Sequence, residues 1–126
     1  MMSMVFAVAC GGALGALGRY FLSNYLETAA GVAFPWGTLT CNVLGCAILG
    51  FLFSALLNFW SPTQEIRVFL TIGLMGAFTT FSAFSLEVVL MIERAQWILA
   101  GTYILVSVVL CVGALFLSIL GARVLL

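Results

Sequence analysis

The chain has 126 residues, of which 65% belong to the hydrophobic set and only 6% are charged, and its formal net charge is zero. Its mean hydropathy of +1.32 sets it far from soluble domains, in which about a quarter of the residues are charged. A water-soluble globular fold is therefore excluded. Nucleic-acid binding is excluded too, because four arginines and no lysine form no basic cluster.

Four uncharged stretches organise the chain, at residues 1–18, 28–64, 68–86 and 95–122. Each can supply the roughly 20 apolar residues that a membrane-spanning helix needs. We predict an all-α integral membrane protein, a single domain over residues 1–126, with four transmembrane helices at about 4–26, 34–59, 65–94 and 97–123. The first stretch has neither the basic start nor the cleavage site of a signal peptide, so we expect it to be retained.

Small and aromatic residues mark the first two predicted helices. Gly11, Gly15 and Gly18 fall near one face of helix 1, where small residues let a neighbouring helix backbone approach closely. Helix 2 starts after Pro35, which suits a first turn, and Trp36 and Trp60 suit the two membrane interfaces.

The middle of the third predicted helix is unusually polar. Gly73 and Gly76 precede Thr79-Thr80-Phe81-Ser82-Ala83-Phe84-Ser85, a run with four hydroxyls in seven residues. Two interpretations remain equally open. The hydroxyls can bond back to their own helix and support helix packing, or the helix is interrupted near residues 76–80, which hydrocarbon permits only where the freed backbone faces protein, water or an ion.

Helix 4 carries two polar residues on one face, and the four cysteines are spread over the apolar segments. Tyr103 and Ser107 are four residues apart and share a helix face. The four cysteines lie in apolar segments without ligand spacing, and the chain has no histidine, so we expect free thiols and no zinc site. These cysteines are Cys10, Cys41, Cys46 and Cys111.

The arginines predict an unusual topology. Four spans place Arg67 and Arg123 on one side of the membrane, and Arg94 with Arg19, near the far end of helix 1, on the other. Because orientation follows the Lys/Arg asymmetry of short loops, an even split predicts insertion in both orientations. We infer that the natural unit is an antiparallel dual-topology homodimer.

The polar residues favour transport of an uncharged or anionic solute. No histidine exists, and no nucleophile with an adjacent base can be assembled, so an enzyme is excluded. The membrane segments instead carry hydroxyls, an amide and a phenol, which are neutral donors, without the carboxylates of a cation pathway. Asn42 lies one turn after Thr38 on helix 2, although an interhelical hydrogen bond also explains an amide there.

Two phenylalanines complete this pattern. Phe81 and Phe84 are spaced i, i+3 beside Ser82 and Ser85. Packing is the usual role of such rings, but their edges carry the positive part of the aromatic quadrupole. Edge-on rings can therefore favour a small hard anion whose lost water is replaced by hydroxyl and amide donors.

These motifs resemble the Fluc (CrcB) fluoride channels. The resemblance rests on PWGTLTCN at residues 35–42, followed by Gly45, on GAFTTFSAFSLE at residues 76–87 and on Gly18-Arg19, and it extends over nearly the whole chain. It implies a multi-pass protein of the bacterial inner membrane, an antiparallel dimer with two pores, and passive export of cytoplasmic fluoride that confers fluoride resistance.

The resemblance also implies residue roles. It assigns Phe81 and Phe84 to the ion path and Asn42 to a pore-facing donor, with Ser82, Tyr103, Ser107 and Thr38 lining or supporting that path. It implies that helix 3 is interrupted mid-membrane and that the break holds a structural sodium ion, which is not transported, through the main-chain carbonyls of Gly76 and Thr79 from both subunits. Arg19 would be a structural or vestibule charge.

Two departures concern the route of the ion. Ala83 stands where the family often has a hydroxyl residue, and Cys111 where a small polar residue is expected. We therefore expect fewer polar side chains along helices 3 and 4 than is usual in the family.

Two alternatives stay open. A small multidrug-resistance exporter also has four helices, but its proton exchange needs a membrane acid in helix 1. Helix 1 has no embedded acid, and Glu87 is expected near the far end of helix 3. A non-transporting accessory subunit is opposed only by the clustered donors of helix 3.

Overall fold

The computed structural model describes residues 1–126 and is entirely helical. Four helical segments are long and apolar enough to cross a membrane, as predicted. They are α1 (Met2–Ala30), α2 (Trp36–Asn58), a third span over Gln64–Glu93, and α6 (Trp97–Leu125). The third span consists of α3 (Gln64–Val68), η1 (Phe69–Met75), α4 (Gly76–Phe78) and α5 (Phe81–Glu93).

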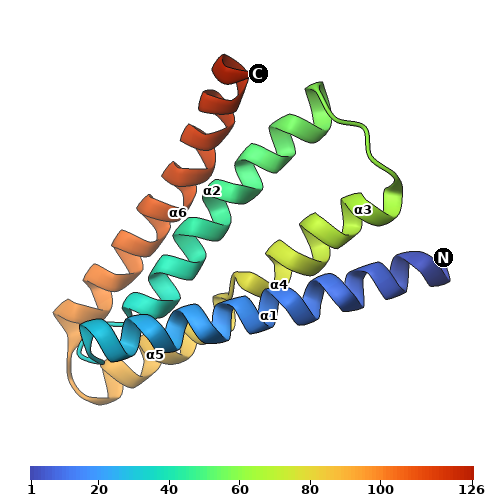
Figure 1. Ribbon diagram of the computed structural model, residues 1–126. Coiled ribbons are helices and arrows are strands. Elements are labelled where there is room, and N and C mark those ends of the chain that lie inside the picture. The colour runs from blue at the N-terminus through green and yellow to red at the C-terminus, as the bar shows by residue number, and fades with distance from the viewer.

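The four spans form two pairs (Figure 1). α1 runs beside the third span, and α2 runs beside α6. The pairs meet at the end where the α1–α2 and α5–α6 connections lie, and they diverge toward the end that carries both termini and the α2–α3 connection. This arrangement puts the termini and the loops at the ends that four successive spans require.

The predicted close approach of helix 1 is confirmed. Gly11 and Gly15 are buried, and a Cβ added to either would collide with main-chain atoms of η1, the carbonyl oxygen of Phe69 in one case and that of Leu74 in the other. Gly73 meets Gly11 from the opposite side. Backbone therefore packs on backbone between α1 and η1, as small residues allow in membranes.

The third span changes its helical geometry twice. η1 is a π-helical stretch, whose wider turns appear in the bond from the Gly76 N–H to the Thr71 carbonyl. Farther on, α4 ends at Thr79, which has φ −87° and ψ 153°, and α5 starts after Thr80, which has φ −150° and ψ 117°. Two successive extended residues thus interrupt the span half-way along its length.

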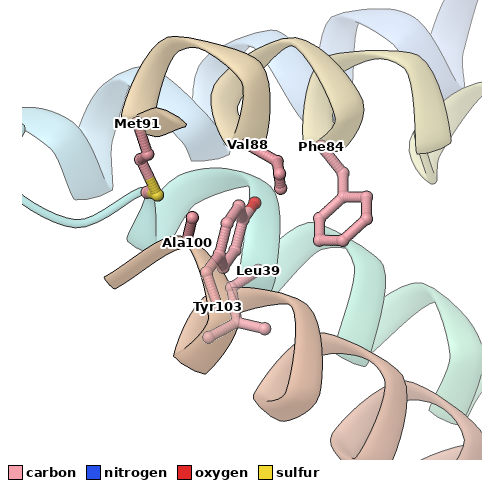
Figure 2. Close-up of a cluster of buried hydrophobic side chains, with 6 residues drawn as sticks. All are labelled: Leu39, Phe84, Val88, Met91, Ala100 and Tyr103. Carbon is pink, nitrogen blue, oxygen red and sulfur yellow. The ribbon is translucent and has the colours of Figure 1, made fainter. Parts of the chain in front are cut away.

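A small core joins α2, α5 and α6 near the closed end of the molecule (Figure 2). Tyr103 has no exposed surface and packs beside Leu39 and Val88. Phe84 is 8% exposed, and its ring centroid lies 5.0 Å from that of Tyr103. This cluster fixes the rotation of α5 and therefore decides where the residues after the interruption point.

The glycine contact predicts a stability difference between two neighbouring substitutions on α1. Gly15→Ala should lower the melting temperature of the detergent-purified protein, because the new Cβ meets the Leu74 main chain. Gly12→Ala is the matched control, since nothing lies within 4 Å of its added Cβ and alanine favours a helix by about 1 kcal/mol. Equal melting temperatures for the two variants would contradict the close contact.

Candidate functional site

The interruption of the third span frees backbone groups that would otherwise form helical bonds. Asn42 on α2 binds one residue there twice: its Nδ2 donates to the Thr80 carbonyl at 3.0 Å, and its Oδ1 accepts from the Thr80 N–H at 2.7 Å. The Thr80 hydroxyl accepts from the Ala83 N–H at 3.1 Å and caps α5. One amide and one hydroxyl thus satisfy the backbone where hydrocarbon offers no water.

These bonds leave two carbonyls without their regular helical donors. The Gly76 carbonyl would accept from the Thr80 N–H, which Asn42 takes. The Thr79 carbonyl would accept from the Ala83 N–H, which the Thr80 hydroxyl takes. They are the same two carbonyls that the family resemblance assigns to sodium. Carbonyl oxygens are suitable ligands for a hard cation, so the residues present fit such an ion.

Arg19 reaches the same region from α1. Its Nε donates to the Ala77 carbonyl at 3.1 Å, just before the interruption. The prediction that Arg19 lies near the far end of helix 1 is wrong, because α1 continues to Ala30, about 16 Å farther at 1.5 Å per residue. Arg19 is half-buried, and its guanidinium binds the backbone of the third span. The flanking arginines are therefore divided two against one, with Arg94 alone on its side.

A cavity of about 310 Å³ opens beside the interruption, between the third span, α2 and α6. Its lining combines hydroxyl and amide groups with aromatic rings and contains no charged residue. The Ser107 hydroxyl is buried there without a hydrogen-bond partner. The predicted site residues that line it are Asn42, Thr79, Phe81, Phe84 and Ser107.

The two phenylalanines lie at the cavity but differ in exposure. Their ring centroids are 5.5 Å apart and the rings are inclined by 46°. Phe84 is buried in the core of Figure 2, whereas Phe81 is 78% exposed. The rings are therefore neither stacked nor perpendicular, and the exposed Phe81 ring forms the open side of the cavity wall.

The remaining predicted residues form a second cluster next to the cavity. Thr38 Oγ1 donates to Glu87 Oε1 at 2.5 Å, and Tyr103 Oη donates to Glu87 Oε2 at 2.6 Å. Ser82 belongs to neither group: it is exposed, and its hydroxyl lies 3.3 Å from that of Thr80. Phe84 connects cavity and cluster because its ring contacts both Phe81 and Tyr103.

Sequence reasoning missed the parts played by Glu87 and Thr80. Glu87 is half-buried within α5 and holds both Thr38 and Tyr103. A signal was present, because Glu87 follows Phe84 by three residues and so shares its face. Thr80 has the signature of an N-cap hydroxyl three residues before Ala83.

Comparison with known proteins identifies the family. The family model described as "CrcB-like protein, Camphor Resistance (CrcB)" matches residues 6–119. The chain belongs to the CrcB family. It is 45% identical to the fluoride-specific ion channel FluC of Rhodospirillum centenum over 91% of both chains, and 44% identical to FluC 1 of Nitrobacter hamburgensis over 98% of both.

A third CrcB relative, the fluoride-specific ion channel FluC of Geobacter sulfurreducens, is 41% identical over 97% of this chain and 98% of its own. All three names describe a channel and not an enzyme. They agree with the exclusion of catalysis made from the sequence. The four spans and the family together make this CrcB protein a multi-pass membrane protein.

The two hydrogen bonds between Asn42 and Thr80 predict that the chain opens locally when the Asn42 side chain is removed. Asn42→Ala leaves the Thr80 N–H and carbonyl unpaired, which costs about 1–3 kcal/mol for a buried polar group. Amide hydrogen exchange at residues 79–83 should therefore speed up, and the melting temperature should fall. Asn58→Ala is the control, because its amide bonds only the Ser54 carbonyl of its own helix. Unchanged exchange at residues 79–83 in Asn42→Ala would show that the pairing does not hold the interruption.

Proposed function

We propose that this protein is a fluoride channel that lets fluoride leave the cytoplasm passively across the bacterial inner membrane. The observation that carries the proposal is the uncharged cavity at the interruption, where neutral donors and phenylalanine rings lie together. The relatives' names supply the identity of the ion.

The lining suits an anion that sheds water. An ion that crosses hydrocarbon must exchange hydration for protein groups, and carboxylates, which would attract cations, are absent from the cavity wall. The Ser107 hydroxyl has no other partner, and the Asn42 amide has a second N–H beyond the one given to Thr80. Fluoride, the smallest and hardest halide, gains most from such donors.

The rings supply positive edges without supplying a proton. Phe81 and Phe84 stand at one side of the cavity with inclined planes, and the edge of an aromatic ring carries partial positive charge. An anion beside such edges is stabilised without being protonated. Conduction also needs weak binding so that the ion can leave, and partial charges meet this need better than an arginine.

A second copy of the chain is proposed to complete the pathway. One chain leaves the cavity open and exposes 78% of Phe81, so an ion there would contact lipid on one side. An inverted copy of this chain would close that side and add its own phenylalanines. The flanking arginines differ by only one between the two sides, a bias small enough to allow insertion in both orientations and therefore an antiparallel dual-topology homodimer.

A structural sodium ion is proposed at the same interface. The Gly76 and Thr79 carbonyls lack helical donors, and Gly76 is exposed on the surface of the single chain. Two chains would bring four such oxygens together. The ion would neutralise these dipoles and stabilise the dimer, without being transported.

The first test is fluoride efflux from proteoliposomes that contain the purified protein, with chloride and a cationic dye as controls. Phe81→Ile and Phe84→Ile keep bulk but remove the ring edge, so each should reduce fluoride efflux about tenfold or more, which corresponds to about 1.4 kcal/mol. Phe116→Ile, on the exposed surface of α6 outside the cavity, is the matched control. If both variants released fluoride at the wild-type rate, the rings would serve only to pack the helices.

The same vesicles separate the channel from a proton-coupled multidrug exporter. Such an exporter would need Glu87, the half-buried acid beside Thr38 and Tyr103. A channel should release fluoride without a pH gradient and should not move the dye. Dye transport that Glu87→Gln abolishes would favour the exporter.

Dual topology predicts a reporter on both sides of the membrane. A C-terminal tag should be accessible from each side in comparable amounts, because only one arginine separates the two flanks. Adding two lysines at the C-terminus should bias insertion toward one orientation and so reduce the number of inverted partners. If the tag on the otherwise wild-type protein were accessible from a single side only, the dual-topology dimer would be contradicted.

The sodium proposal predicts that fluoride efflux requires Na⁺ but is not driven by a Na⁺ gradient. Prolonged removal of Na⁺ should lower fluoride efflux slowly, and a Na⁺ gradient should not drive fluoride uphill. Thr79→Ser should be tolerated because it preserves the carbonyl. Full activity after sodium depletion would remove the reason for a site at Gly76 and Thr79, and uphill movement would indicate a symporter.

A further inference from the structure

Two thiols from different spans face the same cavity. Cys46 lies on α2 and Cys111 on α6, and both line the cavity beside the interruption. Both are free, and the two helices that carry them pack along each other. The other cysteines are placed differently: Cys41 is buried against Ser23 and the Arg19 carbonyl, and Cys10 lies on α1 away from this cavity.

An independent feature shows that the cavity beside these thiols has unused binding capacity. Ser107 precedes Cys111 by one turn of α6, so the two share a face. Ser107 is only 6% exposed, and its hydroxyl has no hydrogen-bond partner. A buried polar atom without a partner is costly, and this one borders a cavity of about 310 Å³.

The ligand set decides which cation fits. The cavity wall contains two thiols but no histidine and no carboxylate, so the four ligands of a structural zinc site are missing. Hard cations prefer oxygen, whereas soft thiolates select soft metals. Two thiolates suffice for a soft d¹⁰ ion that accepts linear two-coordinate geometry.

Charge balance narrows the choice to a divalent ion. Binding follows Hg²⁺ + 2 R–SH → Hg(SR)₂ + 2 H⁺: two S–H bonds break, two Hg–S bonds form, and two protons leave to water. The product is neutral, which matters because the cavity wall is uncharged and an isolated charge is costly in such surroundings. A monovalent ion between two thiolates would leave a net negative charge.

We propose that Cys46 and Cys111 form a two-thiol binding site for soft divalent cations, with Hg²⁺ as the probe, that bridges α2 and α6. A metal ion held there would occupy the cavity next to Ser107 and Asn42. The site itself stands on the thiols and the cavity. Its consequence for transport, inhibition of anion passage, rests on the proposed channel function.

The binding test uses the purified full-length protein with HgCl₂ and an excess of a monothiol such as 2-mercaptoethanol. After gel filtration, metal analysis should find one mercury per chain in the wild type and in the control Cys10→Ala. Cys46→Ala and Cys111→Ser should each retain at least about tenfold less, because a single thiol loses the effective concentration that a second linked ligand provides. Cys46→Ser serves if the alanine variant does not give a monodisperse gel-filtration peak.

Retention of mercury by either single-thiol variant, or its loss from the wild type, would overturn the site. A second readout is fluoride efflux, which Hg²⁺ should block in the wild type, with dithiothreitol restoring the flux. The efflux of Cys111→Ser should be the same with and without Hg²⁺, whatever its own untreated rate. If the untreated wild type shows no efflux, the channel proposal fails and mercury retention still decides the site. If mercury is retained but efflux continues unchanged, the two thiols bind metal outside the ion path and the proposed inhibition is wrong.

Discussion

A peptide group that leaves a helix inside hydrocarbon has no water to bind, and it must find its partners in the protein. In this chain that requirement falls on Thr79 and Thr80, where the third span becomes extended. Asn42 meets it by binding both the N–H and the carbonyl of Thr80. This pairing joins α2 to the third span beside the cavity and takes the regular helical donor of the Gly76 carbonyl.

The rest of the bundle holds the interruption in place from both sides. Before it, glycines of α1 pack directly on the η1 backbone and Arg19 binds the Ala77 carbonyl. After it, the cluster around Tyr103 fixes the rotation of α5 (Figure 2). Phe84 belongs to this cluster and to the cavity wall at once. The site is thus attached to closely packed parts of the fold. Such packing holds the side chains in fixed positions, which a site that acts through weak partial charges needs.

The sequence predicts the spans well because hydrocarbon dictates their length and composition, and the observed boundaries differ from the predicted ones by a few residues. The glycine face of α1 is also predictable, since spacing alone defines a helix face. From the local residues alone the interruption was one of two equal interpretations, because hydroxyls at Thr79 and Thr80 serve a continuous helix as well as a broken one. The family resemblance decided in favour of the interruption. What the local sequence does not contain is the partner, Asn42, which is far away in the chain.

Partners on other helices determine where two charged residues lie. Arg19 was placed near the far end of helix 1, but α1 continues to Ala30, and Arg19 binds the Ala77 carbonyl just before the interruption. Glu87 was placed near the far end of helix 3 without partners, whereas Thr38 and Tyr103 bind both of its oxygens. Both errors come from judging one charge by its own segment, when its partners lie on other helices. The antiparallel dimer and the sodium ion stay predictions, because one chain cannot test them.

The central claim is that the interrupted third span and its neighbours form a passive pathway for fluoride. Its most direct test is the reversal potential of the purified protein in a planar bilayer, with fluoride graded across the membrane and chloride equal on both sides. The potential should move by about 59 mV for each tenfold change in fluoride, as for a monovalent ion, and it should not respond to a pH gradient. A reversal potential that stays at zero, as chloride selectivity would give, or one that shifts with the pH gradient, would contradict the account.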